Sequence, residues 1–343
     1  MPPTGYGPPP GYPGGPPGYA GGPPGYGAPP PGPVHPLDVG RAFKLGWSIF
    51  RFRWRTLLGA VLAVMVPAYV VQLLLTVYLG DAIQRWSDAM SEVIASNPPG
   101  QPIALADLPP LPLEAIGLSF LAGILVSVAS VVAGAALVHV IGWTYGGGRA
   151  SLGLALGQSV RRLPSLLGSS LLMALVIFAI VFAGGALIAL LVLATGFQPG
   201  LAGLLVVVLA VATFAAVMFV GVRWQFVVMA IMLEGRGAVA AMGRSWRLAT
   251  GSSWRVLGYL LLLLLVSFLV GLVVGVLSLI VFGAGVDLRT GQALPFSAAR
   301  VAGQSALTVA IGLVIAPFYS AVMTLLYYDL RWRAREELTP PPA

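Results

Sequence analysis

The sequence contains no cysteine and only two histidines, His35 and His139, in 343 residues. Without cysteine there is no disulfide framework, no thiol nucleophile and no thiolate metal site. Two histidines are too few for a multi-histidine metal site. The sequence also lacks a Gly-x-x-x-x-Gly-Lys-Ser/Thr loop for nucleotide phosphates and a His-Glu-x-x-His zinc motif. We therefore expect no metal, no cofactor and no enzymatic activity.

Charged residues are also scarce. They make up 9% of the chain, whereas hydrophobic residues make up 58%. Soluble domains have about 25% charged residues, so a soluble fold could not bury this much apolar surface. The net charge of +8 does not form one patch but lies at the ends of apolar runs, where it orients a membrane protein. The composition thus predicts an integral membrane protein that does not bind nucleic acid.

Residues 1–36 consist largely of proline, glycine, tyrosine and alanine, and with histidine counted as neutral the first charged side chain is that of Asp38. Such a segment buries too little apolar area to offset the entropy of ordering, so we expect a disordered tail. The tail repeats Pro-Pro-Gly-Tyr at Pro9–Tyr12, Pro16–Tyr19 and Pro23–Tyr26. This pattern is typical of ligands for WW-type aromatic grooves, which would make the tail a binding site for a protein partner. The alternative is a compositionally biased tail that repeats without function.

Six long apolar runs follow, and each is long enough to cross a bilayer as a helix. They cover residues 57–79, 114–142, 166–194, 202–226, 254–283 and 304–328. Arginine and lysine lie almost entirely on one side of these spans. The exceptions are Arg85, Arg289 and Arg300, with Arg223 near a boundary. Because basic residues collect on the cytoplasmic side, we expect a six-helix domain over 37–335, a short tail over 336–343, and both termini in the cytoplasm.

A threefold internal repeat underlies the six spans, with units beginning near Asp38, Arg149 and Arg236. Before each odd-numbered span lies a basic, amphipathic segment with apolar residues at helical spacing, as in a helix that rests in the membrane interface. The segments Leu45–Ile49, Leu156–Val160 and Met242–Trp246 align in one register. The sequence thus predicts an all-α integral membrane fold, built from three repeats of an interfacial amphipathic helix plus a helical hairpin. A further amphipathic helix is expected on the outer side, over residues 81–95.

Four residues within or beside the spans are candidates for function. Arg223 is either an intramembrane charge, which would indicate a functional site, or an anchor whose long side chain reaches the interface. His139 is either a proton relay or a packed histidine near the boundary. Pro67 and Pro317 lie in the middle of the first and last spans, where proline kinks a helix and helps to shape a cavity. Simple packing irregularity is the alternative for both prolines.

The end of the last span carries a resemblance to a known family. Pro317-Phe318 is followed six residues later by Leu-Leu-Tyr-Tyr-Asp-Leu-Arg-Trp-Arg over 325–333, which includes Asp329 and Arg331. This ending resembles the bacterial glycerophosphoryl diester phosphodiesterase membrane domain, a six-span domain. The resemblance implies a bacterial inner-membrane protein. The chain ends at Ala343 without a phosphodiesterase barrel, so the resemblance does not imply phosphodiesterase activity.

Two functions are compatible with these features. The first is a non-enzymatic scaffold or accessory component of envelope or lipid processes in the plasma membrane. The second is a transporter or permease subunit for a small or lipid-like solute, because many transporters are built from repeats. In either case, the basic helices are expected to contact anionic lipids of the inner leaflet.

Overall fold

The structure is a computed structural model, and it describes residues 37–97, 107–146, 148, 151–195, 200–282, 297–334 and 336. The predicted disordered tail over residues 1–36, its Pro-Pro-Gly-Tyr repeats and all of the predicted short tail 336–343 except residue 336 lie outside these ranges. Of the described residues, 91% are helical and none is in a strand. In chain order the helices are α1 (Val39–Ser96), α2 (Leu113–Tyr145), α3 (Leu152–Arg161), α4 (Leu163–Thr195), α5 (Leu201–Trp224), α6 (Val227–Glu234), α7 (Ala238–Ala249), α8 (Ser253–Phe282) and α9 (Ala298–Arg333).

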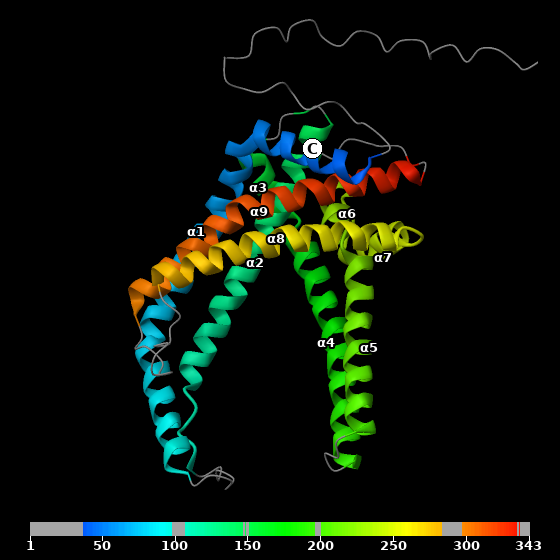
Figure 1. Ribbon diagram of the computed structural model, residues 1–343. Helices are drawn as coiled ribbons and strands as arrows, with labels where there is room; N and C mark the ends of the chain where they lie inside the picture. The colour runs from blue at the N-terminus through cyan, green and yellow to red at the C-terminus, as the bar shows by residue number, and fades with distance from the viewer. Residues whose placement is uncertain are drawn as a thin grey trace, which may run out of the picture.

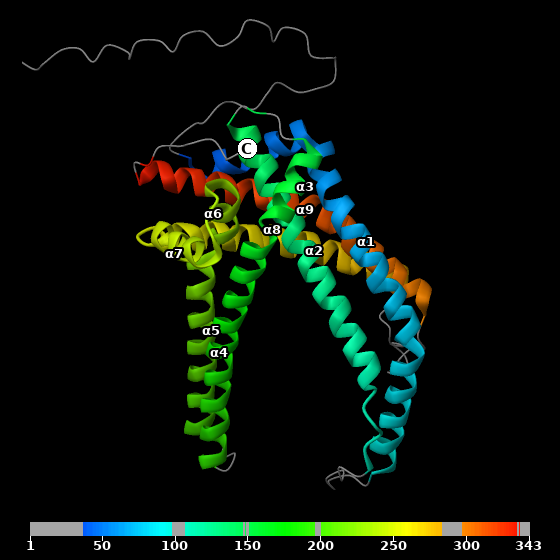
Figure 2. The same cartoon turned by 180° about the vertical axis from the view of Figure 1, so that it is seen from behind.

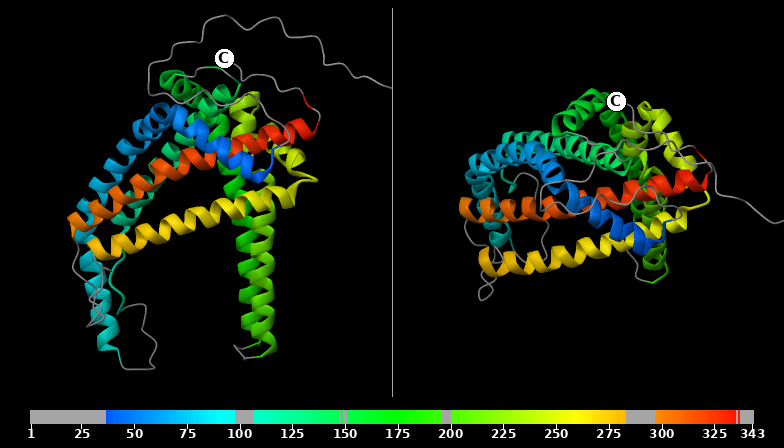
Figure 3. Two further views of the ribbon diagram at one scale, coloured as in Figure 1. Left: turned by 45° about the horizontal axis from the view of Figure 1, so that its top comes forward. Right: turned by 90° about the horizontal axis from the view of Figure 1, so that it is seen from above.

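The long helices form three antiparallel pairs that meet at one end of the molecule. Figures 1 and 2 show α4 beside α5 as one leg and α1 beside α2 as a second leg, with a separation between the legs that widens away from the common end. Helices α8 and α9 form the third pair, which runs across the other two (Figure 3). The short helices α3, α6 and α7 lie at the common end. The start of α1 and the end of α9 lie there as well.

Six helical segments are long and apolar enough to cross a membrane. They are Val39–Gly80, Leu113–Tyr145, Leu163–Thr195, Gly203–Glu234, Ser253–Val281 and Ala302–Arg333. This result confirms the predicted all-α fold with six spans, and it makes the chain a polytopic membrane protein. The helices extend beyond the apolar runs because their polar ends continue the backbone hydrogen bonding after hydropathy falls.

The three amphipathic segments appear in the structure at the start of each hairpin. The first is the beginning of α1, which is set off from the rest of that helix by a kink at Arg53 (φ −117°, ψ 21°). The second and third are the separate helices α3 and α7. On α3 and α7 the side chains packed against the protein are mainly small, among them Ala155, Ser159, Ala241 and Ser245. Larger apolar residues of the same helices face outward, where an interfacial helix contacts lipid.

The outer part of α1 differs from the expectation of a separate helix over 81–95. Helix α1 continues from the first span to Ser96 without a further break. Residues 81–96 contain no proline or glycine, so nothing in this stretch interrupts the helical backbone hydrogen bonds.

The buried core lies at the common end rather than along the spans. It combines the beginning of α1, the second half of α2, all of α6 and the last third of α9. The most apolar 18 residues of each span differ in burial. Of these residues, 56% are buried in α2 and 39% in α9, whereas only 6% are buried in α4, in the fourth span and in α8. The protein is thus packed tightly where its arginines collect, and α4, α5 and α8 expose their apolar side chains laterally.

Candidate functional site: an arginine–carboxylate cluster

Each of the three hairpins is closed at the common end by one arginine. The arginine comes from the start of the odd-numbered span and binds the end of the even-numbered span that completes the same repeat. The pairs are Arg53 Nη2 to the Gly148 carbonyl at 3.4 Å, Arg162 Nη1 to the Gly235 carbonyl at 2.9 Å, and Arg255 Nη2 to Asp329 Oδ2 at 3.1 Å. Carbonyls at a helix C-terminus lack intrahelical partners and attract cations. The repeat is therefore a repeat of contacts as well as of sequence.

Asp329 ties the last repeat to the beginning of the first. Its side chain is fully buried, and its Oδ1 accepts a hydrogen bond from the backbone N–H of Leu37 at 2.8 Å. Its Oδ2 lies 2.9 Å from Arg333 Nε. Arg255, which pairs with the same carboxylate, also donates to the Leu37 carbonyl. Both backbone polar groups of Leu37 are thus satisfied by the third repeat.

Glu234, at the end of α6, is the centre of a second group. Its side chain is 11% exposed and lies 2.6 Å from Arg236 Nε and 3.1 Å from Arg244 Nη2. Arg331 Nε lies 3.6 Å from the same carboxylate, and the Tyr327 hydroxyl donates a hydrogen bond to it. Helices α6, α7 and α9 therefore converge on one carboxylate.

Glu336, beyond the end of α9, completes the group. Arg244 donates from both terminal nitrogens to its carboxylate, with Nη1 to Oε1 at 2.6 Å, and Arg331 Nε lies 3.4 Å away. The hydrogen bonds from Arg244 hold the pKa of Glu336 below its ordinary value. The same interaction raises the pKa of Arg244.

These eight residues form what we call the arginine–carboxylate cluster: Glu234, Asp329, Glu336, Arg236, Arg244, Arg255, Arg331 and Arg333. Each carboxylate contacts at least two arginines. The arginines hold these carboxylates through ion pairs and charge-assisted hydrogen bonds. Among the described residues, no group of three or more His, Cys, Asp or Glu side chains could hold a metal ion. The cluster joins α6, α7, α8 and α9, and it carries an excess of positive charge because its arginines outnumber its carboxylates.

Asp329 and Arg331, which the sequence singles out through the family resemblance, both lie in this cluster and are buried. Arg223 lies outside it, in the last turn of α5. The Arg223 guanidinium lies 4.9 Å from the Phe219 ring centroid and 5.0 Å from that of Trp246, and it donates to Thr250 Oγ1 at 2.5 Å. The structure thus places Arg223 at the end of α5, beside helix α7.

His139 is buried on α2 beside Trp143, with 6.1 Å between the ring centroids. Its Nδ1 has no hydrogen-bond partner among the atoms of the described residues. The structure places no second titratable side chain within hydrogen-bonding distance of it in that part of the chain. His139 therefore occupies a packed position apart from the cluster.

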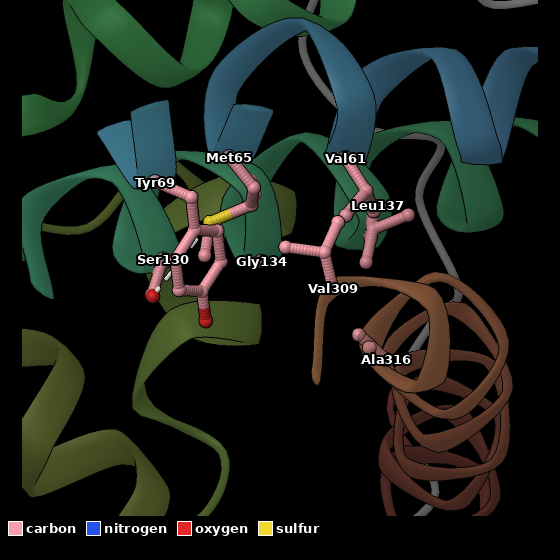
Figure 4. Close-up of a pocket in the computed structure, with 10 residues that line it drawn as sticks. Val61, Met65, Tyr69, Ser130, Gly134, Leu137, Val309 and Ala316 are labelled. Carbon is pink, nitrogen blue, oxygen red and sulfur yellow. Dashed lines mark hydrogen bonds between the residues drawn. The ribbon is translucent and has the colours of Figure 1, made fainter. Parts of the chain in front are cut away.

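The two prolines lie in α1 and α9, and both helices continue through them. The same two helices, together with α2, enclose a small cavity of about 120 Å³ (Figure 4). Its lining includes Met65 and Tyr69 on either side of Pro67 in the sequence, and Ala316 directly before Pro317. Figure 4 shows the Ser130 hydroxyl directed at Met65, with 3.7 Å between Oγ and Sδ. The prolines flank this cavity in the sequence, although neither of them lines it.

The main contributors that the sequence reasoning missed are Glu234, Arg244, Arg255 and Glu336. The sequence does contain a feature that points to these carboxylates. The arginine-rich side of the spans has only five acidic residues, namely Asp38, Glu234, Asp329, Glu336 and Glu337. A carboxylate at the end of a span, surrounded by arginines, is expected to form ion pairs. Which arginine reaches it depends on how the three repeats meet, and periodicity does not contain that information.

No curated protein and no solved structure matches the chain. A family match does cover residues 37–330, which extend from the first interfacial segment almost to the end of α9. This range includes the first five spans, the sixth span up to Leu330, and two of the three carboxylates of the cluster. The chain therefore belongs to the family described as Domain of unknown function (DUF7847).

Proposed function

We propose that this protein is a non-enzymatic scaffold or accessory component of the bacterial plasma membrane, with both termini in the cytoplasm. The observation that supports this proposal best is that arginines bind all three carboxylates of the cluster. Its three carboxylates are held by arginines at one end of the helices, so they are not arranged as an acid and a base around a reacting group. The cluster fixes the relative positions of the hairpins, as a scaffold requires.

The proposed orientation rests on the position of the arginines. The amphipathic segments, the cluster and both ends of the described chain lie at one end of the molecule (Figure 1). Basic residues of short loops remain cytoplasmic. Because the chain has no cysteine, single substitutions Ser91→Cys and Gly153→Cys can report the two sides. A membrane-impermeant maleimide should label Ser91→Cys in intact cells and should label Gly153→Cys only after lysis. The reverse pattern would overturn the orientation.

The surface available to a partner is the exposed apolar face of α4, α5 and α8. Its large side chains include Phe178, Phe214 and Phe268, which are 64%, 66% and 63% exposed. A scaffold would use part of this face to bind the membrane helix of another protein, where small shape differences decide association.

Site-specific photocrosslinking tests the scaffold function directly. Benzoylphenylalanine replaces Phe178, Phe214 or Phe268 in living cells, and replacement of the fully buried Phe226 is the matched control. The scaffold function predicts a discrete protein adduct from at least one exposed position and none from Phe226. Lipid adducts alone at all three exposed positions would contradict the proposal.

One observation favours the alternative of a transporter or permease subunit, namely the cavity between α1, α2 and α9. At about 120 Å³ it is smaller than the 300–1,000 Å³ of typical ligand pockets, so it holds a few heavy atoms at most. A Cβ added at Gly134, which lines the cavity, meets no atom within 4 Å. Uptake by proteoliposomes that is abolished by Gly134→Leu but not by Gly123→Leu, a lipid-side control on the same helix, would favour transport over the scaffold.

The relation to the glycerophosphoryl diester phosphodiesterase membrane domain is part of this proposal. Its support is the segment 325–333, whose Tyr327, Asp329 and Arg331 make the central contacts of the cluster. These three residues join the end of α9 to α6 and α8. A similar short motif is expected in any chain whose last hairpin is held by the same contacts. The relation predicts that the substitutions that disrupt the cluster here also destabilise that domain.

A further inference from the structure

A polar cavity lies beside the cluster, where the α7–α8 turn meets the end of α9. It has a volume of about 540 Å³, and three arginines line it: Arg244, Arg247 and Arg333. Among the described residues that line it, Glu336 is the only one with a carboxylate, and that carboxylate is bound by Arg244 and Arg331. We call this space the α7–α8 cavity.

Arg247 gives the cavity its unbalanced charge. Arg244 and Arg333 each contact a carboxylate of the cluster. Arg247, in the last turn of α7, is exposed and has no ion pair with any residue in the described part of the chain. The cluster already has five arginines against three carboxylates, so Arg247 adds to an existing positive excess. A single anion in the cavity would relieve this excess.

Hydrogen-bond donors beside Arg247 add to the attraction for an anion. Thr250 is already engaged, since its hydroxyl donates to the Trp246 carbonyl at 2.7 Å and accepts from Arg223. Ser252, which also lines the cavity, makes no side-chain hydrogen bond within the described ranges. Helix α8 begins at Ser253, and the positive end of a long helix dipole favours an anion at this position.

The surroundings indicate that the anion belongs to a lipid. Trp254, two residues beyond Ser252, is 86% exposed, and Val239 on α7 is 73% exposed. Tryptophan is enriched at the membrane–water interface, where its ring lies at the level of the headgroups. The cavity also lies where α5 and α8 leave the apolar region. Basic pockets of this kind between membrane helices bind anionic headgroups.

We infer that the α7–α8 cavity binds a phosphate-bearing anion through Arg247 and the Ser252 hydroxyl, with an anionic phospholipid headgroup as the source that the surroundings favour. Arginine suits this ligand because its planar guanidinium forms two parallel hydrogen bonds to phosphate oxygens. The cavity volume of about 540 Å³ lies within the usual range of ligand pockets. It is large enough for a glycerophosphate headgroup. The inference rests on the proposed membrane orientation, and it does not require the scaffold function.

The internal repeat supplies a matched control for the test. Arg161 occupies the last turn of α3, as Arg247 occupies the last turn of α7, and it is also exposed. Arg161 does not line the α7–α8 cavity. Arg161→Gln and Arg247→Gln therefore remove the same charge from equivalent helices, and only the second alters the cavity.

The experiment measures binding to the full chain, purified in a neutral detergent and stripped of lipid, by native mass spectrometry. The probes are short-chain phosphatidylglycerol, short-chain phosphatidylcholine and inorganic phosphate alone. We expect Arg247→Gln to weaken phosphatidylglycerol binding about tenfold and Arg161→Gln to weaken it less than about twofold. Ser252→Ala should give an intermediate loss, and the thermal midpoint of each variant should match that of the unchanged protein.

Each further outcome decides the inference. If inorganic phosphate binds in an Arg247-dependent way and phosphatidylglycerol does not, the site is a phosphate site with a soluble source. Equal losses for Arg161→Gln and Arg247→Gln would overturn the inference, as would equal binding of the two lipids regardless of variant. Because these measurements involve no protein partner, their failure leaves the photocrosslinking result for the scaffold function unaffected.

Discussion

Asp329→Asn tests whether the buried carboxylate holds the first and third repeats together. Asparagine has nearly the same shape, and its Oδ1 can still accept the 2.8 Å hydrogen bond from the Leu37 N–H. The substitution therefore removes the negative charge and little else. Arg255, 3.1 Å away, and Arg333, 2.9 Å away, would lose their counter-ion.

The expected loss of stability depends on how well water can solvate the two arginines once their counter-ion is removed. Removing one partner of a buried ion pair typically costs about 3–5 kcal/mol. Here the side chain of Asp329 is 0% exposed, but Arg255 is 30% and Arg333 39% exposed, so water can partly solvate both. We therefore expect a loss of about 2–3 kcal/mol. At roughly 2 °C per kcal/mol for a chain of this size, the thermal midpoint should fall by about 4–6 °C.

The assay is thermal unfolding in one detergent at one scan rate, followed by tryptophan fluorescence. The control is Asp38→Asn, because Asp38 pairs with Arg41 at 3.3 Å with both side chains 64% exposed, and exposed pairs contribute less than about 1 kcal/mol. Asparagine also caps a helix as well as aspartate. Asp329→Asn unfolding within 1 °C of the unchanged protein would refute the reasoning.

Two further predictions concern the C-terminal carboxylate and the α4–α5 contact. Because Arg244 lowers the pKa of Glu336, this pair stabilises the fold fully above the ordinary glutamate pKa and loses its contribution as pH falls through the lowered value. Glu336→Gln should therefore reduce the loss of stability between pH 7 and pH 3 by less than about 1 kcal/mol, because the carboxylate is partly exposed. The measurement is a smaller drop in thermal midpoint over this pH range, and an unchanged drop would contradict the prediction. At the crossing of α4 and α5, a methyl group on Gly184 would overlap the side chain of Thr213, so Gly184→Ala should destabilise by about 1–3 kcal/mol. Gly185→Ala, which meets open space, should not, and equal melting of the two variants would show that the helices separate freely.

The sequence predicted the membrane fold well because hydropathy and charge act locally. A run of about 20 apolar residues crosses a bilayer whatever its tertiary contacts, so all six spans were found. The kink at Arg53 and the helices α3 and α7 coincide with the predicted amphipathic segments for the same reason. The crosswise path of α8 and α9 was not predictable, because the packing of helices in lipid depends on small differences in side-chain shape.

The candidate site was predicted only in part. The family resemblance singles out Asp329 and Arg331, whereas the sequence analysis did not identify Glu234. Their contacts join residues that are far apart in the chain, such as Leu37 and Asp329 with a separation of 292. Spacing within one helix carries no information on such pairs. Arg247 differs from these residues, because aligning the repeats in the sequence already pairs it with Arg161. Only the structure shows that Arg247 lines a cavity.

The bond between Leu37 and Asp329 has a consequence for the order of assembly. Translation proceeds at about 5–20 residues per second, so the 292 residues that separate the two partners correspond to roughly 15–60 s of synthesis. Throughout that time the backbone N–H of Leu37 lacks the carboxylate that accepts its hydrogen bond in the folded protein. The beginning of the chain is thus completed last. A ribosome stalled before residue 329 should leave the first repeat inserted but open to proteases at its start.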